Sequence, residues 1–386
     1  MVDAFRFKLR TDARFGVGMA EKLGELLKEK GYSNPIILID TGVINLPSIK
    51  KIVEETGKTC KVLKVFENKV PEPTYGSLDE ARTHFEGLKP DCVVGIGGGS
   101  TLDLAKGIAT LMTNPGKGLL YRGFNLVKTL PLPVIAIPTT AGTGSEATFN
   151  AVFTEKSEKK KMGINTEYNF PVLAILDPVL ITSCPKKVAV GSGMDAIVHT
   201  LESFVANAST PTSRMYAKQA FALLFNNLEK AVKDPKDIEA QSKVLLGSHY
   251  AGISLVNSGA GPAGAMSYPL GTYFDVPHGI AGAMFIPHVV KMNVDKGCNT
   301  YNQLYDLIDG ADHGLSEEEK ANEFSKEFTR FCNALDVPKK LNVFGVKKSD
   351  KELLQREAAV LKGAFGMNPV PFGEKEVQEL LDMLID

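Results

Sequence analysis

The chain has 386 residues, more than the roughly 250–300 residues at which a single hydrophobic core stops growing, so we expect two domains. Its 44 Lys and Arg residues against 45 Asp and Glu residues argue against a protein that mainly binds nucleic acid or an anionic membrane surface. A hydrophobic content of 44% argues against disorder, and no run approaches the roughly 18 apolar residues of a membrane span.

The N-terminus and the cysteines bear on the cellular compartment. Residues 1–14 contain no apolar stretch typical of a signal peptide. The five cysteines are scattered and form no CxxC pair, which argues against a disulfide framework or a cysteine-rich zinc site. We therefore expect a cytoplasmic protein.

The first half alternates short apolar strands with helices. Strands that alternate with helices of about 10–15 residues are typical of βαβ units and a parallel sheet. The first domain is therefore predicted to be a doubly wound, Rossmann-like α/β domain over residues 1–183. The predicted strands are Pro35–Asp40, Cys60–Phe66, Cys92–Ile96 and Val134–Ile137, and the predicted helices are Met19–Lys30, Ser48–Thr56, Ser77–Leu88 and Thr101–Thr113.

The strand signal fades after the segment 182–186. Long helix-compatible segments follow, separated by Pro, Gly and Asn. The second domain, residues 184–386, is therefore predicted to be all-α. Its predicted helices are Val188–Ala206, Ser213–Lys233, Ile238–Val256, Glu317–Leu335 and Asp350–Gly363.

A glycine-rich turn, Gly97-Gly98-Gly99, follows one predicted strand and leads into a helix. Glycines let the backbone approach a ligand closely, and the N–H groups and dipole of a helix start favour an anion. Ser100 can cap the helix or donate to a phosphate. A purely structural turn is the alternative, but the strand–turn–helix context favours a phosphate-binding site.

Two other predicted strand ends carry polar groups. Asp40 ends the first strand, where an acid can bind a ribose 2′-OH and repel a 2′-phosphate, although a turn cap explains it equally well. Because Asp40 precedes the glycine turn, this is not the usual Rossmann fingerprint, and no Walker lysine supports an ATPase. The loop Pro138–Glu146 collects hydroxyls and glycines at another strand end, where open α/β sheets bind ligands; an ordinary polar loop is the alternative.

Three residues of the second half form a candidate metal site. Asp195 and His199 are four residues apart in a predicted helix, so they share one face and can bind one cation. A buried Asp–His hydrogen bond is the alternative explanation. His278 is the natural third ligand, and an Asp with two His suits Zn²⁺ or Fe²⁺ better than Mg²⁺ or Ca²⁺.

Together these motifs resemble the iron-containing (group III) alcohol dehydrogenase family, nearly from end to end. The resemblance implies an N-terminal dinucleotide domain, a C-terminal helical domain, an active site in the cleft between them, and a homodimer. The matching motifs are Phe15–Gly18, Gly97–Ser100 with Asp103 and Lys106, Pro138–Thr148, Gly193–His199, Pro269–Gly271, Pro277–Gly279, Ile286–Val289 and Asn368-Pro369.

The resemblance also implies site residues. The expected cofactors are NAD, which Asp40 favours over NADP, and a divalent metal, Fe²⁺ or Zn²⁺. The implied metal ligands are Asp195, His199 and His278, and the implied NAD contacts are Asp40, Gly97, Gly98, Gly99, Ser100, Asp103, Thr139, Thr140, Thr143, Asn150 and Lys161.

The chain departs from the family at one motif. Where the family usually has His-x-x-x-His-Pro-Leu-Gly, this chain has Gly264 and Tyr268 in place of the two histidines. The resemblance implies that Gly264 removes a metal ligand and that Tyr268 replaces a histidine near the substrate. One interpretation is a degenerate site that binds metal weakly or not at all. The other is a three-ligand site whose open positions take water or substrate oxygens.

We expect a dehydrogenase that oxidises a primary alcohol to an aldehyde, or the reverse, with Tyr268 and His278 as catalytic residues. Because two imidazoles are missing, we expect a large pocket and a polyhydroxylated substrate such as a sugar or a sugar acid of the 3-deoxy-octulosonate type. The alternatives are a small-alcohol or diol dehydrogenase or aldehyde reductase, an NAD-using lyase of the dehydroquinate-synthase type, a non-haem iron oxygenase, and a non-catalytic binder.

Overall fold

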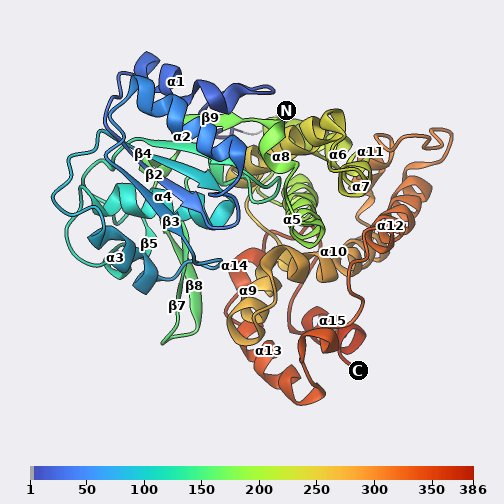
Figure 1. Ribbon diagram of the computed structural model, residues 1–386. Coiled ribbons are helices and arrows are strands. Elements are labelled where there is room, and N and C mark those ends of the chain that lie inside the picture. The colour runs from blue at the N-terminus through green and yellow to red at the C-terminus, as the bar shows by residue number, and fades with distance from the viewer. Residues whose placement is uncertain (1–3) are drawn as a thin grey trace. The chain divides into compact units, whose positions relative to one another are not determined.

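The computed structural model describes residues 4–386, which form two compact units (Figure 1). One unit is Leu9–Cys184, and the other is Pro185–Asp386 together with residues 4–8. The division lies one residue after the boundary predicted between residues 183 and 184. Residues 4–8 join the second unit because the backbone of Lys8 exchanges two hydrogen bonds with the side chain of Asn257, at 2.6 and 2.9 Å.

The first unit is built on six strands that pair only in parallel, in the order β1-β9-β6-β4-β2-β3. The inner strands are buried along nearly their whole length, which explains their continuous apolar sequences. The strands are β1 (Asp12–Phe15), β2 (Pro35–Asp40), β3 (Lys64–Asn68), β4 (Cys92–Gly97), β6 (Val134–Pro138) and β9 (Leu173–Leu176).

Helices cover both faces of this sheet. Ile37 and Ile39 of β2 pack in one core with α1 and α2, whereas Ile36 and Leu38 pack in a second core with α3 and α4. Alternate residues of a strand point to opposite faces, so the sheet is sandwiched between two helical layers, as predicted for a doubly wound domain. The helices are α1 (Leu23–Glu29), α2 (Pro47–Thr59), α3 (Tyr75–Thr83) and α4 (Gly99–Leu111).

A second, smaller sheet was not predicted from the sequence. It has three strands in the order β5-β8-β7, and β7 and β8 form an antiparallel hairpin. The strands β5 (Gly123–Phe124), β7 (Val152–Glu155) and β8 (Lys160–Asn165) are short, and the last two flank a charged turn, so their apolar pattern is weak.

The second unit is helical, and no strand occurs in residues 185–386. The predicted fold class, an α/β domain followed by an all-α domain, is confirmed. No helix in residues 4–386 has the length and apolar character needed to cross a membrane. The helices are α5 (Lys186–Val205), α6 (Pro211–Phe225), α7 (Leu228–Lys233), α8 (Ile238–Ser258), α9 (Pro262–Phe274), α10 (His278–Asp295), α11 (Asn302–Tyr305), α12 (Glu317–Ala334), α13 (Lys351–Ala358), α14 (Lys362–Phe365) and α15 (Glu374–Leu384).

Two predicted helices are interrupted, and four helices of the second unit, α9, α10, α11 and α15, were not predicted. The predicted helix Ser213–Lys233 breaks at Asn226 and Asn227, whose side-chain amides bond to the carbonyls of Leu307 and Leu223. Asp350–Gly363 likewise divides into α13 and α14. Helices α9 and α10 contain interior prolines, which remove a backbone donor and mask the helical signal, yet both helices are held by packing.

Candidate functional site

Helix α5 presents two of the predicted metal ligands. Asp195 and His199 lie on the same face of this largely buried helix and are 4% and 8% exposed. The Nε2 atom of His199 is 3.6 Å from Oδ1 of Asp195. The i, i+4 spacing thus brings the two donors to one point, as the sequence predicts.

The third predicted ligand comes from the first residue of α10. Nε2 of His278 is 3.7 Å from the same Oδ1 atom of Asp195. One donor atom from each of Asp195, His199 and His278 lies within 4.8 Å of the others, and no other such group of three occurs in residues 4–386. The structure therefore brings together three side chains that are far apart in the sequence.

The donor set fits a divalent transition metal. Bonds of about 2.0–2.1 Å in tetrahedral geometry place ligand atoms about 3.3–3.4 Å apart, slightly closer than the 3.6 and 3.7 Å found here. No side chain or backbone group in residues 4–386 donates a hydrogen bond to the Asp195 carboxylate, although it is buried. A buried carboxylate without such donors favours a cation as its partner.

A glycine next to His278 permits this convergence. A Cβ atom at Gly279 would overlap the carbonyl oxygen of Gly191 on α5 and lie 3.0 Å from Cβ of Asp195. The Pro-His-Gly motif therefore lets the start of α10 press directly against α5, which is what carries His278 to Asp195.

Glu202, one turn beyond His199 on α5, is a buried acid that the sequence analysis missed. Its buried carboxylate accepts N–H bonds from Gly261 at 2.8 Å and from Ala263 at 2.6 Å, at the start of α9. Burial raises the pKa of Glu202 to about 7, and the backbone N–H bonds oppose this rise. Its spacing from Asp195 and His199, one more turn along α5, is the signal that could have identified it.

The two positions where the family histidines are replaced behave differently. At Gly264, a Cβ would lie 2.9 Å from Oε2 of Glu202 and 3.8 Å from Cγ1 of Val198, so the glycine is closely packed. Tyr268 stacks on the imidazole of His278, with ring centroids 5.2 Å apart and an interplanar angle of 16°. The structure therefore places Tyr268 beside one of the candidate metal ligands, His278.

In the α/β unit, most of the predicted NAD contacts lie at the carboxyl ends of β2, β4 and β6, which are neighbours in the sheet. Asp40 ends β2, the glycine turn follows β4, and the loop after β6 donates the N–H of Thr139 to the carbonyl of Gly97 at 3.0 Å. A Cβ at Gly99 would lie 2.5 Å from Cγ2 of Thr143, so this glycine lets the turn and the loop touch. Ligands of open α/β sheets bind at such strand ends.

Several of these polar groups also bind other parts of the protein. The Asp40 carboxylate accepts bonds from the N–H of Gly42 at 2.8 Å and from the hydroxyl of Thr101 at 3.3 Å, so it is a turn cap as well. The remaining predicted residues also have partners within the protein. Ser100, at the start of α4, donates to the carbonyl of Pro71, and Asn150, just before β7, donates to Asn165. Lys161 on β8 pairs with Glu72, and Thr140 lies beside Gly98.

Asp103 takes part in a buried network with Lys106. The Lys106 ammonium, which is 0% exposed, donates to the carbonyl and hydroxyl oxygens of Ser145 and to the carbonyl of Asn150, each at 2.7 Å. The Asp103 carboxylate accepts from Ser145 Oγ at 2.6 Å and from the N–H of Val152 at 2.9 Å. Both carboxylate oxygens thus accept hydrogen bonds from the protein, so Asp103 anchors the segment that follows β6 to α4.

In this network, burial disfavours the charged forms of Lys106 and Asp103, and the ion pair between them favours these forms. Burial lowers the pKa of Lys106 and raises the pKa of Asp103, and the 3.6 Å ion pair between them opposes both shifts. The pair connects α4 to the loop after β6 through its hydrogen bonds to Ser145 and Asn150.

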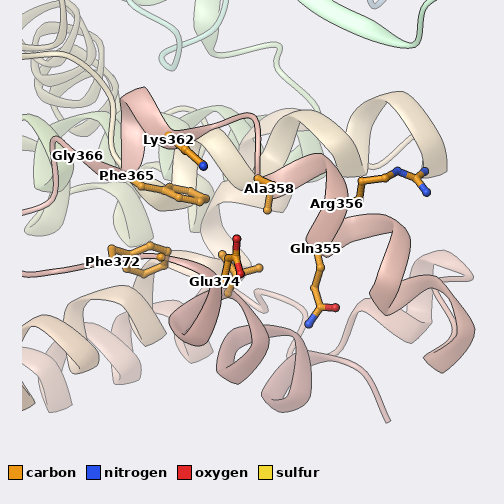
Figure 2. A pocket seen from close by; sticks show the side chains of 11 residues that line it. Gln355, Arg356, Ala358, Lys362, Phe365, Gly366, Phe372 and Glu374 are labelled. Carbon is orange, nitrogen blue, oxygen red and sulfur yellow. The ribbon is translucent and has the colours of Figure 1, made fainter.

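A pocket of about 730 Å³ lies elsewhere in the helical unit, between α13, α14 and α15 (Figure 2). Lys362 and Glu374 point toward each other from opposite walls, and the rings of Phe365 and Phe372, 5.1 Å apart, close one side. None of the candidate metal ligands lines this pocket.

Comparison with known proteins gives consistent matches over both units. The family model for iron-containing alcohol dehydrogenase matches residues 11–178, and the model for the C-terminal part of the Fe-containing alcohol dehydrogenase family matches residues 189–385. The chain is 32% identical to an NAD-dependent methanol dehydrogenase of Bacillus methanolicus, over 89% of this chain and 90% of that protein. It is 27% identical to a lactaldehyde reductase of Escherichia coli over 98% of both chains.

Solved structures agree with these matches. A crystal structure of a 1,3-propanediol oxidoreductase superposes with a TM-score of 0.93 at 27% identity, covering 98% of this chain and 99% of the other. The similarity therefore extends over the whole fold.

The contact between α10 and α5 can be tested by replacing Gly279 with Ala. Because the new Cβ overlaps the Gly191 carbonyl, we expect the Gly279→Ala variant to lose about 1–3 kcal/mol of unfolding free energy. Gly282→Ala on the same helix is the matched control, since its Cβ would have only an ordinary 3.4 Å contact with Val198. Urea unfolding followed by circular dichroism measures the loss of unfolding free energy. Equal unfolding midpoints for the two variants would show that the close contact at Gly279 does not limit stability.

The buried ion pair can be tested with Lys106→Met. The variant leaves the Asp103 carboxylate without its cation, so we expect a loss of about 3–5 kcal/mol in unfolding free energy. The control Lys58→Met removes an exposed lysine and should change stability by less than about 0.5 kcal/mol. Denaturation of both variants in urea distinguishes them, and a Lys106→Met protein as stable as the control would contradict the network's role.

Proposed function

This chain belongs to the iron-containing alcohol dehydrogenase family, as its sequence motifs indicate, and we propose that it catalyses reversible NAD-dependent hydride transfer between an alcohol and its aldehyde. The observation that carries the proposal is the convergence of Asp195, His199 and His278 in a helical unit that accompanies a doubly wound dinucleotide-type unit. This grouping favours a dehydrogenase over a non-catalytic binder.

We propose that Asp195, His199 and His278 hold the divalent metal, Fe²⁺ or Zn²⁺. A bound cation would supply Lewis acidity, which lowers the pKa of a substrate alcohol. The protein's own contribution is to fix the three donors by the α5–α10 contact and to place Tyr268 next to them. Tyr268 is proposed to orient the substrate hydroxyl and to pass on its proton.

We propose that NAD binds along the carboxyl ends of β2, β4 and β6, at the predicted contacts. The start of α4 would offer backbone N–H groups and a positive dipole to the phosphates, and the Asp40 carboxylate would accept a hydrogen bond from a ribose hydroxyl. Within this site, Asp103 is a positioning residue, because its carboxylate binds Ser145 and Val152 and acts through the loop. The cofactor supplies the redox chemistry, and the protein supplies position and electrostatics.

A small alcohol, diol or aldehyde is the substrate class we propose. The relatives described above are named for methanol, lactaldehyde and 1,3-propanediol, so they favour this alternative over the large polyhydroxylated substrate expected from the missing histidines. At Gly264, the Oε2 atom of Glu202 would lie 2.9 Å from an added Cβ, so part of the space beside this glycine is already filled.

The assembly and the compartment stay predictions from the sequence. A homodimer is the expected state, which sedimentation of the purified protein would check. A cytoplasmic location is likewise expected.

Substrate and metal can be tested together. The metal-loaded protein should form NADH with small alcohols and diols and should turn over sugars and eight-carbon sugar acids far more slowly. Asp195→Asn removes a proposed ligand charge and should lower kcat/KM at least about 100-fold, whereas Asp295→Asn, at an exposed ion pair, should change it little. Activity confined to the large polyols would overturn the proposed substrate class. NAD binding without turnover of any substrate would overturn the proposal that the protein is a dehydrogenase.

Cofactor choice can be tested at Asp40. The Asp40→Asn variant keeps an acceptor for the Gly42 N–H but removes the negative charge that would repel a 2′-phosphate. We expect the ratio of kcat/KM for NADP to that for NAD to rise about tenfold or more, which corresponds to about 1.4 kcal/mol. Measuring both cofactors with one alcohol gives the ratio, and an unchanged ratio would show that Asp40 is only a turn cap.

A further inference from the structure

We propose that Ser267 is a positioning residue that fixes the tautomer and the direction of His278 toward the metal. This inference rests on the proposed function, because it concerns the same metal centre. Ser267 lies on α9 between the two positions at which this chain lacks the family histidines, and it is 1% exposed.

Two short hydrogen bonds meet at the Ser267 hydroxyl. Its Oγ atom is 2.5 Å from the carbonyl oxygen of Gly264, one turn earlier on α9, and 2.6 Å from Nδ1 of His278. A carbonyl oxygen can only accept, so the single hydroxyl proton of Ser267 is donated to Gly264. The hydroxyl oxygen must then accept from His278, which places a proton on Nδ1.

This proton assignment determines what Nε2 can do. A neutral imidazole with a proton on Nδ1 has a lone pair on Nε2, the form needed for metal ligation. Nε2 is also the atom that lies 3.7 Å from Asp195 Oδ1, on the side of the other ligands. The Ser267 bond therefore holds the ring in the protonation state and the orientation that the centre requires.

The neighbouring residue restrains the same ring from another direction. Tyr268 packs nearly parallel against the face of His278, while Ser267 holds its edge. A hydrogen bond at the edge and a stacked ring on the face together oppose rotation of the imidazole about its side-chain bonds. Two consecutive residues of α9, Ser267 and Tyr268, thus restrain the same imidazole, and we call this pair the His278 clamp.

The other candidate ligand histidine has no comparable support. The buried Nδ1 atom of His199 lacks a hydrogen-bond partner among residues 4–386, and the ring is placed by its position on α5 beside Asp195. In a site with three protein ligands, loss of order in one ligand removes a third of the donors. Ser267 therefore has a large influence on how tightly the metal binds.

Metal affinity tests this role. Metal-free wild type and Ser267→Ala are titrated with Co²⁺ and followed by visible absorption, and we expect the variant's Kd to be about 10- to 100-fold higher. Ser254→Ala is the matched control, because Ser254 is also a buried, hydrogen-bonded serine of this unit but contacts no candidate ligand. A serine that only supports the fold would lower the melting temperature of the metal-free protein and leave the Co²⁺ affinity and spectrum unchanged.

The outcomes separate this inference from the proposed function. If wild type binds no Co²⁺, the metal centre itself is overturned and the role of Ser267 falls with it. If wild type binds Co²⁺ and Ser267→Ala binds it equally well with the same spectrum, only the positioning role is overturned. Weaker binding by Ser267→Ala, with the control unchanged, supports the clamp.

A second measurement needs no variant at the serine. Nitrogen-15 spectra of histidine-labelled, metal-free protein distinguish the two imidazole tautomers, and His278→Gln assigns the signal. We expect His278 to carry its proton on Nδ1. A proton on Nε2 would overturn the inference even if Ser267→Ala fails to fold.

Discussion

The direct contact between α10 and α5 is the constraint on which the candidate metal centre depends. Asp195 and His199 are fixed relative to each other by a single helix, but His278 belongs to another helix and reaches them only because Gly279 carries no side chain where α10 meets Gly191. A third helix, α9, is held by Glu202, which lies one turn beyond His199 on α5. The Glu202 carboxylate accepts hydrogen bonds from the N–H groups at the start of α9. One stripe of α5 therefore organises the helices that build the centre.

The α/β unit solves a similar problem with charge. The edge of its sheet that is predicted to bind NAD consists of turns and loops rich in small residues. Lys106 and Asp103 lie beneath this edge and join α4 to the loop after β6 through bonds to Ser145, Asn150 and Val152. Burying such a pair is costly, which suits a position where the geometry of a binding surface matters more than stability.

Motifs with local geometry could be predicted from the sequence, whereas long-range partners could not. The i, i+4 spacing of Asp195 and His199 and the apolar strands ending at Asp40 and Gly97 follow directly from helix and strand periodicity. The partners of Asp103 and the approach of Ser267 to His278 depend on how distant elements pack, which no single segment encodes. Helices α9 and α10 were missed for a related reason, since tertiary packing holds them despite their interior prolines.

The division of the ligands between two helices has a thermodynamic consequence. An ion held by Asp195 and His199 on α5 and by His278 on α10 is a cross-link that exists only in the folded unit. By mass action, an ion present at 100 times its Kd would add about 2.7 kcal/mol to the stability of the fold. The lifetime of the helical unit in a cell would then follow the supply of metal, so that starvation for the ion would reduce the amount of the enzyme as well as its activity.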